Sequence, residues 1–96
     1  MAYQLRYDKH FRQSLQSLPS AIRSLARKSI ANLAQEPRPI RAKELDNHPT
    51  YYRLWLSKNY RLIWQVIEED KIVDLIYVGP KVLGLYDQLR FQRNGH

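Results

Sequence analysis

The chain has 96 residues, and its 16 Lys and Arg against nine Asp and Glu give a formal charge of +7 at pH 7. This length suits one domain with one core, and such a chain buries about 60–70% of the surface that its unfolded form exposes. The lack of cysteine excludes disulfides and thiolate metal sites and fits a reducing cytoplasm. We expect neither a signal peptide nor a membrane span, because no apolar run approaches the ~20 residues that cross a bilayer. The charge favours a polyanionic or acidic partner.

The first half of the chain predicts a strand and two helices. Residues 2–7 alternate weakly between apolar and polar side chains, as in a short strand. Asp8 can cap a helix whose apolar residues recur at helical spacing, namely Phe11, Leu15 and Leu18. Pro19 suits the first turn of a second helix, whose apolar stripe comprises Ile22, Leu25, Ala26, Ile30 and Leu33. Pro37 and Pro39 end this helix because proline cannot continue the backbone ladder, so the two helices form a hairpin.

Alternation replaces helical spacing in the second half of the chain. Tyr52, Leu54 and Leu56 alternate with Tyr51, Arg53 and Trp55. Residues 57–59 and 68–71 are turns, so that strands over 51–56, 60–67 and 72–78 form a three-stranded antiparallel meander. A short final helix follows, with the apolar positions Val82, Leu85, Tyr86 and Leu89. The predicted class is therefore α+β, with one domain over residues 1–91 and a mobile basic tail over 92–96.

The two-residue period of strands assigns side chains to the faces of this sheet. If Leu54, Leu62 and Val66 face the helices, the opposite face carries Arg53, Trp55, Arg61 and Gln65. Trp64, inside an apolar run, belongs to the core. We expect the helices to cover one face and leave the other open. An open face with cations and aromatic rings is a natural groove for a single nucleic-acid strand.

Several short motifs together resemble the RelE/ParE superfamily, the toxins of type II toxin–antitoxin pairs. They run over most of the chain and are Phe11…Leu15…Leu18-Pro19, Pro37-Arg38-Pro39, Lys43-Glu44-Leu45, Tyr52-Arg53-Leu54, Asn59-Tyr60-Arg61-Leu62-Ile63-Trp64, and Val78-Gly79 followed by Tyr86. Each motif is weak alone, but their order and spacing are specific. The chain is more similar to the RelE branch than to the ParE branch.

The resemblance implies a function and a set of partners. Members of the RelE branch are ribosome-dependent endoribonucleases that enter the ribosomal A site and cut mRNA. Members of the ParE branch share the fold, lack the cutting residues and poison DNA gyrase. Both kinds of toxin are held inactive by a cognate antitoxin, which usually also carries the operator-binding domain. The resemblance therefore implies an antitoxin, the ribosome and mRNA as partners, operator DNA only through the antitoxin, and no membrane.

The RelE pattern also implies site residues. Arg53 stands at its first basic position, and Trp55 stands where a second basic residue is usual. Arg61 matches the strand arginine, Lys81 matches the arginine after the glycine, and Tyr86 matches the late tyrosine. We take Arg61, Lys81, Tyr86 and Arg53 as the catalytic candidates. The RNA-binding candidates are Lys58, Trp55, Lys43 and Arg90.

The chemistry of RNA cleavage assigns roles to these candidates. Without a metal or cofactor, the 2′-hydroxyl attacks phosphorus with the help of a base, cations around the phosphorane and an acid. Arg61 can clamp the phosphate through paired hydrogen bonds, Lys81 can stabilise charge or transfer a proton, and Tyr86 can stack or hydrogen-bond. His48 is expected to be a loop residue. Two alternatives stay open: a ParE-like gyrase poison without catalysis, which Trp55 favours, and a basic RNA-binding module without toxicity.

Overall fold

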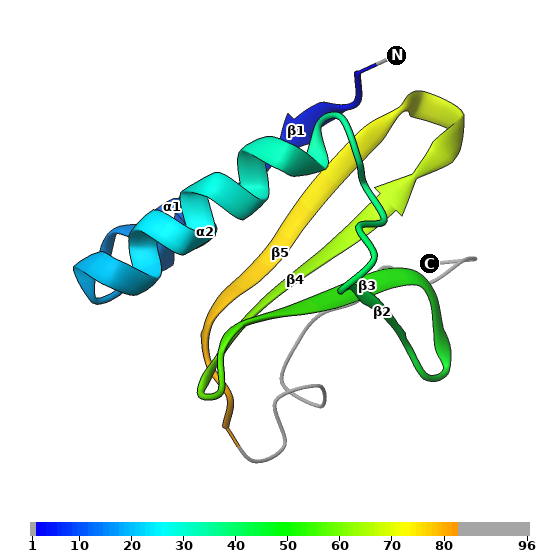
Figure 1. Ribbon diagram of the computed structural model, residues 1–96. Helices are drawn as coiled ribbons and strands as arrows, with labels where there is room; N and C mark the ends of the chain where they lie inside the picture. Colours follow the sequence, from blue (N-terminus) through cyan, green and yellow to red (C-terminus); the bar gives the residue numbers. More distant parts are fainter. Residues whose placement is uncertain (1, 83–96) are drawn as a thin grey trace.

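Five strands form one sheet, and two helices pack against one of its faces (Figure 1). The computed structural model describes residues 2–82, so the predicted final helix beyond Val82 and the 92–96 tail lie outside them. The elements in chain order are β1 (Gln4–Arg6), α1 (Lys9–Gln16), α2 (Ser20–Leu33), β2 (Lys43–Leu45), β3 (His48–Ser57), β4 (Tyr60–Ile67) and β5 (Ile72–Pro80), with a 3₁₀ turn at Glu68–Asp70 before β5. The predicted α+β class is confirmed.

Local sequence signals set the helix ends. Asp8 caps α1 as predicted, because its Oδ1 accepts a hydrogen bond from the Phe11 backbone nitrogen at 2.9 Å. Pro19 immediately precedes α2, where its fixed φ suits the entry into a helix. α2 ends at Leu33, earlier than the prolines require, and the carbonyl of the next residue, Ala34, accepts from the Tyr3 backbone nitrogen at 2.7 Å. Neither helix within residues 2–82 is long and apolar enough to cross a membrane.

The buried stripes of the helices follow the predicted spacing with one exception. Phe11 of α1 and Ala26, Ile30 and Leu33 of α2 are buried in the core between the helices and the sheet. The sequence predicts Leu25 in the same stripe, but 46% of its surface is exposed. One residue step turns a helix by about 100°. Leu25 therefore points about 100° away from its neighbour Ala26, outside the buried face of α2.

The strand order is β1-β5-β4-β3-β2. The strands β3, β4 and β5 pair antiparallel, which confirms the predicted meander. β1 pairs in parallel with β5, and β2 pairs antiparallel with β3. The sequence does not predict β2, because three residues are too few for alternation to be seen. This additional strand brings Lys43 opposite Arg53.

The side-chain alternation on the helix side of the sheet is as predicted. Leu62 and Val66 belong to the core under the helices, and Leu54 packs against it. Trp64 is fully buried in the same core, as predicted, and its Nε1 donates to the Pro37 carbonyl at 2.9 Å. Pairing of a buried indole N–H avoids the cost of an unsatisfied donor.

The opposite face is not open throughout, although the residue pattern predicts an open face. Tyr51 and Ile63 lie on that face and are only 3% and 0% exposed. They form a second small core with Leu45, and Ile76 and Tyr77 pack against it. Leu45 comes from β2, so the strand that the sequence did not reveal helps to bury this part of the sheet. A nucleic-acid groove is thereby restricted to the remaining part of the face.

A polar network ties the loop after α2 to the sheet. Glu68 accepts hydrogen bonds from Tyr3 Oη at 2.7 Å, from Arg38 Nη2 at 2.8 Å and from Lys71 Nζ. Arg38 Nε also donates to Tyr52 Oη at 3.1 Å. These donors, above all Lys71, lower the pKa of Glu68 from 4.5 to about 2.

Candidate active site

Arg61 and Trp55 form the centre of the candidate site. They are Cα partners in the β3–β4 ladder, and directly opposed residues project from the same face of a sheet. The Arg61 guanidinium carbon lies 4.0 Å from the centroid of the Trp55 ring, and Lys81 Nζ lies 5.6 Å from the same centroid. Both distances fall within the ~6 Å reach of cation–π attraction. The indole therefore gathers two of the cations that the sequence predicts as catalytic.

Arg61 is held at this position with little exposure. Only 6% of its surface is accessible, although a guanidinium stays charged in proteins. The face of the indole supplies favourable electrostatics for this charge without adding an opposite charge that would compete for it. A planar donor fork that is already ordered loses little entropy when it binds phosphate. The arrangement suits an anion clamp.

A cleft of about 260 Å³ adjoins Arg61. Its lining residues are Lys43, Glu44, Leu45, Asp46, His48, Arg53 and Arg61. Three predicted cations, Lys43, Arg53 and Arg61, thus meet at one cleft. Two carboxylates at the same cleft make its charge mixed. The arginines can bind a phosphate here through charge-assisted hydrogen bonds.

The remaining predicted residues are placed as follows. Lys58 is exposed in the turn between β3 and β4. Lys81 follows β5 directly, and its backbone nitrogen donates to the Asn59 carbonyl at 2.8 Å, which ties the end of β5 to the same turn. Tyr86 and Arg90 lie outside the described residues.

Three titratable side chains at the cleft are not predicted by the sequence pattern. Glu44 and Asp46 line it beside Arg53, and so does His48. The expectation that His48 is a loop residue is wrong, because His48 begins β3 and its backbone pairs with Leu45. The signal that points to this placement is the pair Asp46-Asn47, since two such residues between short strands favour a tight hairpin.

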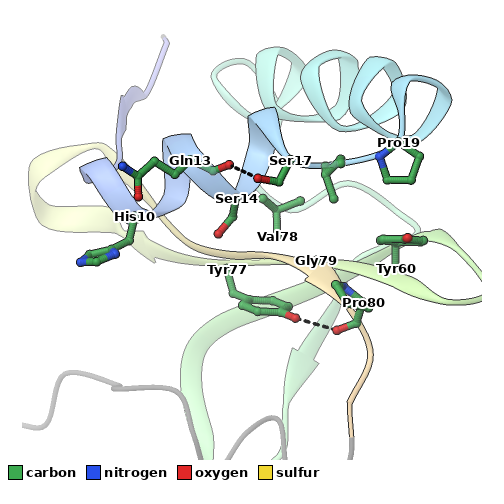
Figure 2. Close-up of a pocket in the computed structure, with 11 residues that line it drawn as sticks. His10, Gln13, Ser14, Ser17, Pro19, Tyr60, Tyr77, Val78, Gly79 and Pro80 are labelled. Carbon is green, nitrogen blue, oxygen red and sulfur yellow. Dashed lines mark hydrogen bonds between the residues drawn. The ribbon is translucent and has the colours of Figure 1, made fainter.

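A larger hollow of about 410 Å³ lies between α1 and the end of β5 (Figure 2). Its described lining includes His10 and Tyr60 but no Lys or Arg, so it does not offer a phosphate clamp. Tyr77 also lines it, and its Oη donates to the Pro80 carbonyl at 2.6 Å, while burial raises the pKa of its phenol. Gly79 leaves room for this ring, because a Cβ there would lie 2.8 Å from Tyr77 Oη.

Known proteins resemble this chain in sequence and in fold. No family model matches the sequence. The chain is 35% identical over 82 residues to the mRNA interferase toxin RelE of Escherichia coli strain K12, and the match spans 84% of this chain and 85% of that protein. A mutant of E. coli RelE in the free state superposes with a TM-score of 0.75 at 30% identity, with 92% and 94% of the two chains covered.

The intact E. coli RelBE toxin–antitoxin complex gives a TM-score of 0.73 at 33% identity, covering 84% of this chain and 99% of the other. Both the sequence and the fold therefore agree over most of the length of each chain. The resemblance to the RelE branch that the motifs predict is confirmed, and this protein belongs to the RelE toxin family.

Proposed function

We propose that this protein is the toxin of a type II toxin–antitoxin pair and an endoribonuclease that cleaves mRNA in the ribosomal A site. The observation that carries the proposal is the 35% identity, along most of both chains, to an mRNA interferase toxin RelE. The cleft at Arg53 and Arg61 supports it, because guanidinium groups recognise phosphate through paired hydrogen bonds.

The reaction assigned to this site is a metal-free transfer within the RNA. The 2′-hydroxyl oxygen attacks the adjacent phosphorus, and the bond from phosphorus to the 5′-oxygen breaks. Arg61 and Arg53 hold the phosphate and counter the charge that develops on it. Lys81 adds a positive charge within cation–π distance of the Trp55 ring. Tyr86 contacts the base or the scissile bond in this scheme.

The ribosome supplies the geometry that the isolated cleft lacks. Arginines remain charged and therefore bind phosphate without transferring protons. Orientation of two reacting groups alone can remove about 7–11 kcal/mol from a barrier, and an mRNA held in the A site has its conformation fixed. Trp55 stacks on a base, and Lys43, Lys58 and Arg90 contact the RNA backbone.

A cognate antitoxin is the natural inhibitor of this site. The E. coli relative has been solved in an intact RelBE toxin–antitoxin complex. The charge of +7 favours an acidic or amphipathic antitoxin segment that covers the cleft at Arg61. Operator DNA is bound through the antitoxin. The protein acts in the cytoplasm, where ribosomes translate mRNA.

Primer extension on a defined mRNA in a purified translation system tests the function. New 5′ ends inside the A-site codon are expected with ribosomes and the wild-type chain, and they should be lost with Arg61→Ala. Arg12→Ala is the matched control, because it removes an arginine on α1 beside Tyr7. Intact mRNA together with trapped DNA–gyrase breaks would overturn the proposal in favour of a ParE-like poison.

A further inference from the structure

The cleft at Arg61 also holds an imidazole. His48 lines it together with Arg53, and Trp55 occupies the neighbouring position opposite Arg61 without a group that transfers protons. Imidazole is the side chain that most readily exchanges protons near neutral pH. Within the described lining of this cleft, His48 is therefore the best-suited proton donor.

The backbone around His48 is fixed in an uncommon conformation. Asn47 and Thr50 have positive φ angles of 63° and 74°. A β-branched residue adopts such an angle only where the surroundings enforce it. Here the Thr50 backbone nitrogen donates to the Glu44 carboxylate at 3.0 Å. Pro49 further restricts His48 to extended backbone, so the hairpin sets the direction of the His48 Cα–Cβ bond.

The ring of His48 is supported from the sheet. It meets the ring of the buried Tyr51 edge-on, with centroids 6.4 Å apart and planes at 79°. Gln65 of β4 donates through Nε2 to Thr50 Oγ1 at 3.2 Å, which ties the hairpin to the centre of the sheet. A side chain that transfers protons benefits from such support, because small displacements lower the rate steeply.

The charges around the cleft suit a bound phosphate. The cations Lys43, Arg53 and Arg61 line the same cleft as His48 and can attract the substrate phosphate. A phosphate held there brings the scissile bond to the cleft that the imidazole lines.

We propose that His48 is the general acid of the mRNA cleavage, an inference that rests on the proposed function. The bond between the 2′-oxygen and phosphorus forms while the bond from phosphorus to the 5′-oxygen breaks. The His48 imidazolium gives its proton to the departing 5′-oxygen, the proton of the 2′-hydroxyl passes to solvent water, and solvent then reprotonates His48. The products are a 2′,3′-cyclic phosphate and a 5′-hydroxyl, with no net change in protons.

The test compares two leaving groups in single-turnover cleavage of ribosome-bound mRNA. One mRNA carries the natural 5′-oxygen at the scissile bond, and the other carries a 5′-bridging sulfur, which departs as a thiolate without needing a proton. His48→Gln should slow cleavage of the natural mRNA by about 10²–10⁴-fold, the range of general acid catalysis. On the sulfur mRNA the same variant should stay within about 10-fold of wild type.

His10→Gln is the matched control, since His10 lines the separate hollow at α1. In addition, free imidazole should restore part of the activity of His48→Ala. The ribosome concentration that half-saturates cleavage by His48→Ala should match that of the wild-type protein. If the wild-type protein cuts, an equal loss of His48→Gln activity on both mRNAs, or no loss on either, would overturn the role of His48. Failure of the wild-type protein to cut either mRNA would instead overturn the proposed function, and this inference with it.

Discussion

Trp55 lies directly opposite Arg61 across β3 and β4, and the guanidinium carbon is 4.0 Å from the centroid of its ring. An aromatic ring thus stands where the family resemblance leads one to expect a second basic side chain. The Trp55 ring attracts the Arg61 cation and adds no positive charge of its own. This relationship changes how the site is expected to respond to mutation.

Trp55→Ala should lower mRNA cleavage by about 10-fold, equivalent to about 1.4 kcal/mol, because Arg61 loses the ring that orders it. Trp55→Phe should retain most of the activity, since a benzene ring still attracts a cation. A double-mutant cycle with Arg61→Ala in the primer-extension assay checks the mechanism. If the two losses simply multiply, the ring acts independently of Arg61.

Lys81→Ala should reduce cleavage because it removes a positive charge near the Trp55 ring. The expected loss is on the order of 10–10²-fold, below the 10²–10³-fold typical of a donor buried at the reacting centre, since Lys81 is exposed. Lys81→Arg should keep more activity than Lys81→Ala. Lys9→Ala, at the start of α1, controls for net charge. Equal activity of Lys81→Ala and Lys9→Ala would show that Lys81 has no role in cleavage.

Glu68 should make the stability of the fold depend on pH in the acid range. Its pKa falls from 4.5 to about 2 on folding because of hydrogen bonds from Lys71, Tyr3 and Arg38. The ionised carboxylate therefore contributes stability that is fully present above about pH 4.5 and is lost as the pH falls towards 2. Urea midpoints for wild type and Glu68→Gln should differ at pH 7 and converge near pH 2. Glu69→Gln, in the same turn, should show a smaller difference.

Trp64→Phe should destabilise the fold without directly touching the cleft. The substitution leaves the buried Pro37 carbonyl without its indole donor, at a cost of about 1–3 kcal/mol, and the smaller ring adds a cavity term. Urea denaturation should show a lower midpoint at an unchanged slope. Trp55→Phe, at a 40% exposed position, is the matched control. Similar midpoints for both variants would contradict a core role for Trp64.

Much of this fold follows from local sequence signals. Patterns of a few neighbouring residues predict the Asp8 cap, the two helices and the three long strands. The structure contains each of these elements. With Leu54, Leu62 and Val66 taken to face the helices, the two-residue period of strands places Arg61 and Trp55 on the same face of the sheet. Those features depend on chain stereochemistry and on the burial of periodic apolar side chains, which act within one element at a time.

The composition of the site was decided by pairing between segments. A three-residue β2 gains stability only from its ladder with β3, and this ladder carries Leu45 into the second core and His48 to the cleft. Leu25 is excluded from the helix stripe by the sheet against which α2 packs. The sequence alone determined the family, the class of fold and the cations at Arg53 and Arg61. Only the tertiary structure decided that an imidazole joins them, because register between distant strands is set by packing across the sheet and not by local pattern.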